Sequence, residues 1–199
     1  LHNFSKTDFK TKIKDKQIDN VYRRGKFIVF DFKSCIMAVH LRMTGKLYVV
    51  PNLNKQKKHT SAILKISDKY LIFEDTRKFG RFYLYDSIDF LDNKLGIEPF
   101  CEDFTEKWLV AGLKKKNRQM KSLLLDQSFI AGLGNIYTDE ALWHARIHPL
   151  SKSDSIAVKK IKILYRAIKK VLSESIKRGG TTIRDYTYDY SYVGNYALQ

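Results

Sequence analysis

The stretch LLLDQSFIAGLGNIYTDEALWHARIHP, from Leu123 to Pro149, decides the fold of the second half of the chain. Helix-forming residues stand on both sides of AGLGN, where a single helix could simply continue. Gly132 and Gly134 permit backbone angles that other residues resist, so the pattern predicts two helices that meet at a sharp reversal. Because glycine has no side chain, another backbone can also come close to this turn.

A turn of this kind can bind an anion such as a phosphate. The N–H groups at the start of the second helix, near Ile136 and Tyr137, form an anion site strengthened by the helix dipole, and the Asn135 amide can donate to the same anion. A helix–helix turn without a ligand is the alternative that GxGN by itself leaves open. A dinucleotide-binding turn is excluded, because no third glycine follows at the required spacing and LLLDQSFI does not have the pattern of a strand.

The composition indicates an acidic partner. The 199 residues carry a formal net charge of +16 with a pI near 9.7, and 13% of them are aromatic. Nucleic acid is the first candidate, because a phosphate backbone favours many lysines through counterion release and aromatic rings can stack or wedge between bases. A basic protein without such a role, a ribosome-type binder and, less favoured, a ligand of anionic membranes stay open.

The sequence predicts a cytosolic protein without a membrane partner. It has no run of about 18 apolar residues and no charged-then-apolar leader. Cys35 and Cys101 lack the spacing of zinc ligands and the density of a disulfide scaffold, so each is more typical of a small buried hydrophobe.

The first half of the chain has the pattern of β-strands, after an opening of 25 residues that reads as a short helix leading into a strand. Short turn signals such as MTG and SDK separate the runs, which predicts an antiparallel meander over residues 26–86, folded into a sandwich or a partly open barrel. The runs are KFIVFDF, CIMAVHL, GKLYVV, SAILKIS, YLIFEDT and RFYLYD.

The second half has a helical pattern. The strand pattern ends near LGIEPFCEDF, where Pro99 marks a linker. From Ile156 to Ile176 the apolar residues fall on one face, which predicts an amphipathic helix with a basic outer face, and Gly179 and Gly180 suit its C-terminal end. The predicted class is therefore α+β.

Further blocks extend the pattern along nearly the whole chain: RRGK at 23–26, HLRMTG at 40–45, KH at 58–59, DTRKFGRF at 75–82, LGIEP at 95–99 and GGTTIRDY at 179–186. Together with GLGNIYTDEALW and IHP, these blocks resemble those of the bacterial formamidopyrimidine-DNA glycosylase family, in that family's order. The resemblance implies an antiparallel β-sandwich domain over residues 1–97, incomplete at its N-terminal end. A helical domain with a helix-two-turns-helix motif would follow over residues 98–180, and a tail over residues 181–199 would lead toward a zinc finger.

The family resemblance implies a DNA-repair enzyme. Members remove oxidised purines such as 8-oxoguanine and formamidopyrimidines from duplex DNA in base-excision repair, as combined glycosylases and AP lyases. Their N-terminal proline attacks the sugar C1′, forms a Schiff base, displaces the base and then eliminates both flanking phosphates by β,δ-elimination. Damaged double-stranded DNA is the implied partner, and we expect a monomer.

The resemblance also assigns roles to single residues. Met43, Arg77 and Phe79 match side chains that enter the DNA where the damaged base is flipped out, although by sequence alone Met43 and Phe79 suit a turn or the core. Lys26 matches a lysine near the reacting sugar and its phosphates. The phosphate contacts match His59, Asn135 with Gly132 and Gly134 at its turn, and, as a weaker candidate, Lys116; ordinary surface positions are the alternatives for Lys26, His59 and Lys116.

The match fails at both ends of the chain. The family begins with proline and glutamate, whereas this chain begins LHNFSKTDFK and has no proline before Pro51. The four cysteines of the family's zinc finger do not occur before Gln199, so zinc is implied for a complete relative but has no ligands here. We therefore expect the 199 residues to be an inactive fragment of an active enzyme or a partial gene product, rather than a natural binding protein that lost its chemistry.

Two rival readings remain. An endonuclease VIII-like relative that prefers oxidised pyrimidines shares the helix-two-turns-helix block, but DTRKFG and ARIHP favour the purine branch. A noncatalytic nucleic-acid binder could use the same motif, but it would have no reason to keep the strand-rich half with its wedge residues.

Overall fold

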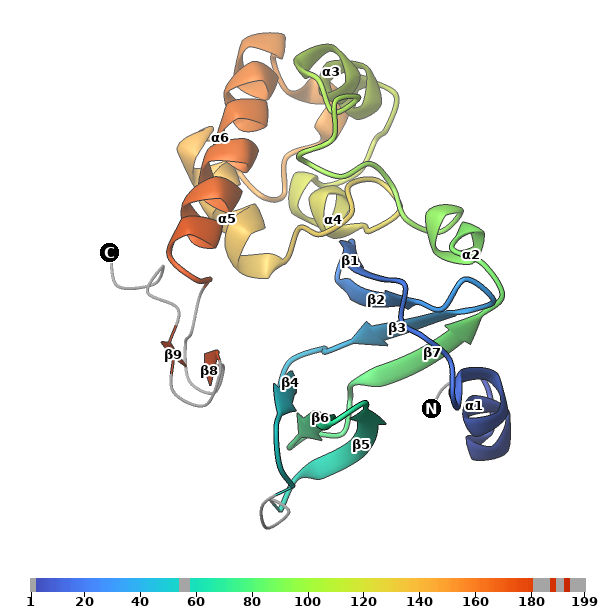
Figure 1. The fold of residues 1–199 in the computed structure, drawn as a ribbon. Helices are drawn as coiled ribbons and strands as arrows, with labels where there is room; N and C mark the ends of the chain where they lie inside the picture. The colour runs from blue at the N-terminus through green and yellow to red at the C-terminus, as the bar shows by residue number, and fades with distance from the viewer. Residues whose placement is uncertain (1–2, 54–57, 181–186, 189–191, 194–199) are drawn as a thin grey trace. The chain divides into compact units, whose positions relative to one another are not determined.

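The computed structural model describes residues 3–53, 58–180, 187–188 and 192–193. The chain forms two compact units that divide between Ile88 and Asp89. Strands build most of the first unit and helices build the second, which confirms the predicted α+β class (Figure 1). Among the described residues, no helix is both long and apolar enough to cross a membrane.

Residues 3–88 of the first unit contain two antiparallel sheets (Figure 1). One has the strand order β1-β2-β3-β7 and the other the order β4-β6-β5. The short helix α1 (Lys6–Ile13) precedes them, with Ser5 and Asp8 forming a capping box at its start. The strands are β1 (Asn20–Arg24), β2 (Phe27–Asp31), β3 (Ile36–His40), β4 (Gly45–Val50), β5 (Thr60–Ile66), β6 (Lys69–Asp75) and β7 (Arg81–Tyr85).

The predicted strands are confirmed, but the predicted meander is wrong. After β3 the chain leaves the first sheet, builds β4, β5 and β6, and returns as β7 beside β3. Within the second sheet, β4 pairs with β6 instead of with β5. A tight turn joins the neighbouring strands β5 and β6, whereas nine residues (51–59) separate β4 from β5, and these two strands lie on opposite sides of β6.

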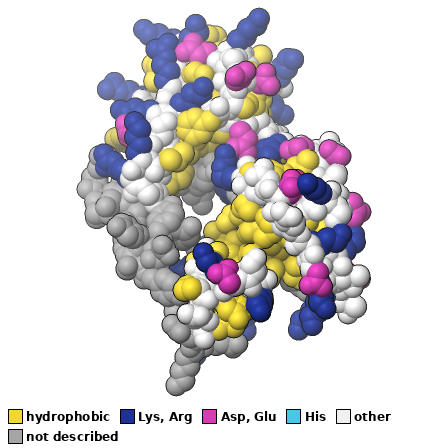
Figure 2. All heavy atoms as spheres, viewed as in Figure 1, with side chains coloured by type: hydrophobic (Ala, Val, Ile, Leu, Met, Phe, Trp, Pro, Cys, Tyr) yellow, Lys and Arg dark blue, Asp and Glu magenta, His cyan; other side chains and the backbone are white. Residues whose placement is uncertain are grey.

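The core of the first unit consists of inward-facing residues from both sheets. Phe73 on β6 and Phe82 on β7 meet edge to face with ring centroids 5.1 Å apart. Alternation along β6 buries Leu71, Phe73 and also the carboxylate of Asp75. A cavity of about 1310 Å³ opens beside this core, lined among others by Phe9 of α1 and by Phe73. The described residues therefore fill the apolar interior only in part, and hydrophobic side chains are visible at the surface of this unit in Figure 2.

The second unit is a helical domain. Its helices are α2 (Asp89–Asp92), α3 (Glu106–Lys114), α4 (Met120–Leu125), α5 (Asn135–His144) and α6 (Val158–Lys177), with a short 3-10 helix η1 (Ser153–Ser155) before α6. Helix α6 packs against α5 and α3. Seven of the core side chains that exclude solvent completely are Phe104, Leu109, Leu123, Leu133, Ile161, Leu164 and Ile168. Burial of each aliphatic side chain contributes roughly 1.5–3 kcal/mol, so this core is what holds the turn before α5 in place.

The structure places the unit boundary earlier than residues 97 and 98, where the sequence analysis had it. The reason is that LGIEP belongs to the helical unit. The Gly96 N–H donates to the Gln127 carbonyl at 2.8 Å, and the Ala131 N–H donates to the Ile97 carbonyl at 2.8 Å. The predicted linker is thus packed against the segment that follows α4, while the predicted tail over 181–199 lies outside the described residues except for β8 (Thr187–Tyr188) and β9 (Tyr192–Val193).

The long amphipathic helix is confirmed, with a narrower buried face than predicted. Ile156 precedes α6 as the residue that ends η1. Val158 is 44% exposed and Ile176 is 68% exposed, one near each end of the helix. Of the predicted apolar face, Ile156, Ile161, Leu164, Ile168 and Val171 are buried, whereas Val158 and Ile176 are exposed.

Candidate nucleic-acid interface

Asp75, the last residue of β6, organises two neighbouring loops of the first unit. Its side chain is only 1% exposed. Oδ1 accepts the Thr44 hydroxyl proton at 2.5 Å and the Arg77 N–H at 3.2 Å, and Oδ2 accepts the Gly80 N–H at 2.7 Å. Desolvation opposes ionisation, but the hydrogen bonds from Thr44 and from the backbone of Gly80, Arg77 and Phe79 outweigh it and hold the pKa of Asp75 below its usual range. A buried carboxylate therefore ties the loop after β3 to the loop after β6.

Gly80 must be a glycine because of this carboxylate and its neighbour. A Cβ atom at Gly80 would stand 2.3 Å from the Phe73 ring and 3.1 Å from Asp75 Oδ2. The same loop holds Lys78 in the left-handed region, with φ of 55°. The loop that presents Arg77 and Phe79 is thus fixed by close packing as well as by hydrogen bonds.

The predicted wedge residues lie exposed on these two loops. Met43 is 66% exposed and Phe79 is 52% exposed, which excludes the core positions that the sequence had left open. The guanidinium of Arg77 reaches the sulfur of Met43, with Nη1 3.5 Å from Sδ. The structure therefore brings two of the three wedge candidates into contact and places Phe79 two residues further along the Arg77 loop. Exposed apolar side chains beside a cation suit insertion into stacked bases.

His40 supports the Met43 loop from the end of β3. Its Nδ1 accepts the Arg42 N–H at 3.0 Å, and Arg42 has a φ of 58°. The imidazole meets the Phe27 ring edge to face, with centroids 4.9 Å apart. Burial, followed by the positive charges of Arg42 and Lys26, lowers the pKa of His40 to about 4. His40 is therefore neutral near pH 7, and a neutral ring is needed to accept the Arg42 proton.

Lys26 lies at the same end of this sheet. It occupies the two-residue turn between β1 and β2 with Gly25, since Arg24 pairs with Phe27. Partial desolvation, and then the nearby charge of Arg42, lowers the pKa of Lys26. The register that pairs Phe27 with His40 explains why Lys26 and Arg42 lie near His40, in one cluster whose positive charge comes from Lys26 and Arg42. An ammonium group of lowered pKa is better suited to proton transfer than an ordinary lysine.

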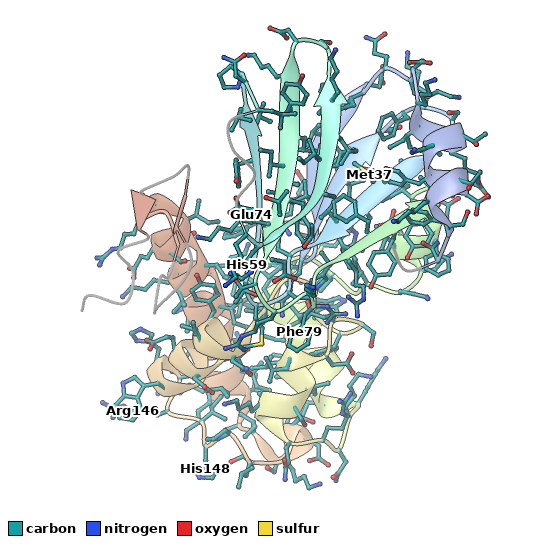
Figure 3. All side chains as sticks on the ribbon, turned by 90° about the horizontal axis from the view of Figure 1, so that it is seen from below. Met37, His59, Glu74, Phe79, Arg146 and His148 are labelled. Atoms are coloured by element: carbon teal, nitrogen blue, oxygen red, sulfur yellow. The ribbon has the colours of Figure 1, made fainter. Side chains whose placement is uncertain are left out.

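His59 lies directly before β5 of the three-stranded sheet, beside the end of β6 that carries Asp75. Its side chain is exposed, and its carbonyl accepts the Asp75 N–H at 3.1 Å. Figure 3 shows His59 and Phe79 toward the same end of this sheet. The structure therefore brings His59 to the strand end that also carries the wedge loops.

In the second unit, Gln127 closes the turn before α5. Its side-chain amide donates to the carbonyls of Leu125 and Leu133, each at 2.9 Å, and its Oε1 accepts the Gly132 N–H at 2.9 Å. Gly132 has a φ of 98°, so this position needs a glycine. The prediction of special backbone angles is wrong for Gly134, whose φ of −115° and ψ of 177° are ordinary extended values. Gly134 is instead the N-cap of α5 and offers only the absence of a side chain.

The N-terminus of α5 is open. No side chain caps it, and Asn135 and Ile136 are exposed. The Ser175 hydroxyl bonds to the Tyr137 hydroxyl at 2.5 Å, which fixes the first turn of α5 against the end of α6. Because the first N–H groups of a helix have no partner within it and the helix dipole is positive there, this end suits an anion. This geometry is compatible with the predicted phosphate site, whose assignment stays a prediction.

Lys116 has a less distinctive setting. It is exposed in the segment after α3, where its ammonium stands 5.7 Å above the Phe129 ring and its carbonyl accepts the Ser153 hydroxyl. These contacts tie Lys116 to the segment after α4 and to η1, and its assignment to a phosphate stays a prediction.

The described residues do not form a metal site. None of them make a group of three or more His, Cys, Asp or Glu side chains that could hold an ion. Cys35 is buried, with its thiol directed to the Lys12 carbonyl at 3.6 Å, and burial raises its pKa; Cys101 is half-buried. Neither cysteine is part of a group of side chains that fits zinc.

Sequence reasoning missed three positioning residues, Asp75, Gln127 and His40. A signal for Asp75 was present, because an aspartate at the inward position of the alternating run Leu71, Phe73 and Asp75 must be paired by hydrogen bonds. Gln127 and His40 offered no such signal, since their partners are backbone groups that only the turns bring together.

Exposed apolar and cationic side chains on fixed loops in one unit, and an open helix N-terminus in the other, are typical of a protein that binds nucleic acid. Comparison with known proteins supports a narrower class. The "Formamidopyrimidine-DNA glycosylase N-terminal domain" family matches residues 1–82, and the "Formamidopyrimidine-DNA glycosylase H2TH domain" family matches residues 95–187. The chain belongs to the formamidopyrimidine-DNA glycosylase family.

Individual relatives agree with this assignment. The chain is 43% identical over 196 residues to the formamidopyrimidine-DNA glycosylase of Pelotomaculum thermopropionicum, covering 96% of this chain and 71% of the relative. It is 42% identical over 177 residues to that of Protochlamydia amoebophila, covering 88% of this chain and 64% of the relative. The chain thus spans about two thirds of the length of these relatives.

Solved structures show the same fold. A Lactococcus lactis FPG mutant in complex with a Fapy-dG containing DNA superposes with a TM-score of 0.86 at 36% identity, covering 95% of this chain and 72% of the other. The complex between the Lactococcus lactis Fpg and an abasic site containing DNA gives 0.83 at 37% identity, covering 92% and 68%.

Proposed function

We propose that the protein is a DNA glycosylase of base-excision repair that removes oxidised purines, among them 8-oxoguanine and formamidopyrimidines, from duplex DNA. The observation that carries the proposal is the exposed set Met43, Arg77 and Phe79, presented on two loops that one buried carboxylate fixes. The names of the relatives and the damaged DNA in the related complexes support the same substrate class.

In this proposal the wedge residues act when the damaged base leaves the helix. Extrusion of a base leaves a gap in the stack, and unstacking costs on the order of a few kcal/mol. The exposed Phe79 ring and Met43 side chain fill that gap, while the Arg77 guanidinium faces the orphaned partner base. Asp75 does not touch the DNA and acts as a positioning residue for all three.

Phosphate binding completes the interface. The open N-terminus of α5, with the Asn135 amide, binds one backbone phosphate, and His59 and Lys26 contact others at the strand ends of the first unit. The formal charge of +16 then favours association with any duplex, so lesion preference has to come from the wedge loops.

We assign the bond-breaking step to the complete protein. In this proposal that protein is a glycosylase and AP lyase of the bacterial cytosol. The secondary amine of an N-terminal proline attacks the sugar C1′, the oxidised base leaves, and the resulting Schiff base undergoes β- and then δ-elimination of the flanking phosphates. Lys26, with its lowered pKa, lies in the cationic cluster that would stabilise these phosphates and assist proton transfer. The 199 residues contain no proline before Pro51, so by themselves we expect them to bind but not to cleave. We assign zinc to a segment of the complete protein other than the described residues.

Binding of matched duplexes tests the wedge. We would compare an intact duplex with duplexes that contain 8-oxoguanine, thymine glycol or an abasic-site analogue. Phe79→Ala should lower the preference for the lesion duplex by about tenfold, which corresponds to about 1.4 kcal/mol. Phe100→Ala removes a similarly exposed ring from the other unit, 48% against 52%, and should leave the preference unchanged. An unchanged preference in Phe79→Ala contradicts the wedge role, and a preference for thymine glycol favours the pyrimidine-specific alternative.

Two further measurements separate binding from chemistry. Asn135→Asp places a carboxylate at the proposed phosphate site, so it should weaken duplex binding at low salt; equal affinity places the phosphate elsewhere. The intact mass and N-terminal sequence of the protein made by its source organism test the chemistry. A product that begins with proline and traps covalently on DNA under borohydride supports the Schiff base, and one that begins at Leu1 overturns it.

A further inference from the structure

The outer face of α6 carries a stripe of cations. At 3.6 residues per turn, six basic residues of this helix return to the same side, about one for each turn. They span residues 159–177, a length of about 27 Å at 1.5 Å per residue. Figure 2 shows Lys and Arg side chains gathered over α3 and α6. The residues of this α6 stripe are Lys159, Lys162, Arg166, Lys169, Lys170 and Lys177.

The α6 stripe faces away from the core of its unit. The buried residues of α6, among them Ile161, Leu164 and Ile168, point toward α5 and α3, and the stripe lies on the opposite side. Five of its six residues are exposed, and Lys169 is half-buried with its ammonium 5.0 Å from the Tyr165 ring. The positive charge is therefore directed to solvent.

Carboxylates neutralise the stripe only in part. Glu106 at the start of α3 pairs with Arg166 at 3.0 Å and lies 3.9 Å from Lys162. Glu174 lies 3.9 Å from Lys170. Among the described residues, two carboxylates thus face these six cations, and such exposed pairs contribute little energy, so a polyanion could displace them.

The α6 stripe is separate from the phosphate site at α5. The bond between Ser175 and Tyr137 sets the end of α6 beside the start of α5, and Lys160 Nζ donates to the Arg146 carbonyl just beyond the end of α5. The two helices therefore run antiparallel, and the stripe extends from the Asn135 end along the whole of α5 and beyond. A phosphate held by the N-terminus of α5 leaves most of this stripe uncovered.

We propose that the α6 stripe is a second, sequence-independent binding surface for the phosphate backbone of duplex DNA, so that the protein engages a second DNA segment while its lesion-reading surface holds the first. The inference rests on the proposed function for the identity of the first segment. Duplex DNA presents one charge per about 1.7 Å of axis, so a stripe of about 27 Å can follow the phosphates of one strand over several base pairs. The apolar face of α6 is used in the core, which argues against insertion of this helix into a membrane.

Two surfaces make direct transfer between DNA segments possible. If the α6 stripe captures a second duplex before the first one leaves, unlabelled duplex should accelerate dissociation of a labelled one. With a single surface, the dissociation rate is independent of the competitor concentration. Stopped-flow fluorescence of the 199-residue chain on a short labelled duplex with an abasic-site analogue measures this rate against intact competitor duplex.

The stripe variant combines Lys159→Gln, Lys169→Gln and Lys177→Gln, three lysines that no described carboxylate pairs. The control variant combines Lys6→Gln, Lys10→Gln and Lys14→Gln on and after α1, with the same loss of charge. For the parent and the control, a tenfold rise in competitor should raise the dissociation rate several-fold, whereas the stripe variant should show no rise. The logarithm of the binding constant for the second duplex falls linearly with the logarithm of the salt concentration. In the stripe variant this slope should be less steep by about 2.7, since three phosphate contacts are lost at about 0.9 each.

The outcomes are distinct from those of the proposed function. Equal acceleration in the parent and the stripe variant, or no acceleration in the parent, overturns the α6 stripe as a DNA surface. A third outcome favours a membrane: the parent binds vesicles of anionic lipid, the stripe variant does not, and duplex DNA does not accelerate dissociation from the parent. This outcome also overturns the α6 stripe as a DNA surface. The preference of the parent for the lesion duplex is measured without competitor. If the parent shows no such preference, the glycosylase proposal is contradicted, while the result on transfer between duplexes still stands.

Discussion

Replacement of Asp75 by asparagine tests how the wedge loops are held. The change keeps the shape of the side chain but turns one acceptor oxygen into a donor group. The carboxylate acts only as an acceptor in the hydrogen bonds described for it. The donors are the Thr44 hydroxyl and the N–H groups of Arg77, Phe79 and Gly80. In either orientation, the new amide hydrogens must therefore face at least one of these donors.

The magnitude follows from burial and charge. Hydrogen bonds to a charged group contribute about 1.5–3 kcal/mol each, and a buried donor left without a partner costs about 1–3 kcal/mol. If the amide oxygen keeps Thr44 and Arg77, the bond to Gly80 is lost, and we expect Asp75→Asn to lower the unfolding free energy of the first unit by about 2–4 kcal/mol. The pKa of Asp75 is lowered in the folded state. The difference in unfolding free energy between Asp75→Asn and the parent should therefore have its full size above the unfolded pKa of about 3.9 and should shrink as the pH falls below it.

Urea unfolding followed by two signals measures the effect. Far-ultraviolet circular dichroism reports on both units, whereas both tryptophans, Trp108 and Trp143, lie in the helical unit and report on it alone. The tryptophan transition should therefore stay in place while the remaining dichroism transition shifts. Asp68→Asn in the exposed turn between β5 and β6 is the matched control. A shift of less than about 0.5 kcal/mol for Asp75→Asn, no greater than for a neutral surface change, refutes the reasoning.

The remaining predictions concern the turn before α5 and the acid response of the first unit. Gly132→Ala should destabilise the helical unit by about 1–2 kcal/mol because φ is 98°, while Gly134→Ala should cost under about 1 kcal/mol; equal shifts in the tryptophan-monitored urea midpoint contradict this. Gln127→Leu removes three hydrogen bonds and should lower the stability of the same unit by about 1–3 kcal/mol in thermal unfolding, and an unchanged midpoint counts against its role. The pKa of His40 is about 4 in the fold against about 6.5 unfolded, so stability should fall by up to about 3 kcal/mol as pH drops from 6.5 to 4, and His40→Gln should abolish that part of the slope in urea unfolding at each pH.

The sequence located most secondary structure because the evidence for it is local. Alternation of apolar residues marks β2 to β7, and helical spacing marks α6, whichever elements pack against them. Turn residues were read correctly where conformation forces the choice, as at Gly132. At Gly134 the same reasoning failed, because the sequence alone does not distinguish two reasons for a glycine. One position needs a positive φ, as at Gly132, and another, such as Gly134, has ordinary backbone angles and only lacks a side chain.

Sheet order and the residues that position the interface depended on long-range contacts. Nothing local states that β4 pairs with β6, since consecutive strands need not be neighbours in a sheet when more than a tight turn separates them. The exposure of Met43 and Phe79 likewise follows from where the loops end up once Asp75 has drawn them together.

By itself, then, the sequence determined the class of fold, the positions of its strands and long helix, and the basic character that suits a phosphate backbone. These properties are sums or periodicities over neighbouring residues, and they do not depend on the path of the chain. Only the tertiary structure decided that Arg77 touches Met43 and that Gln127 closes the turn before α5. Each of these depends on groups that folding brings together or buries, and that is information the local sequence does not contain.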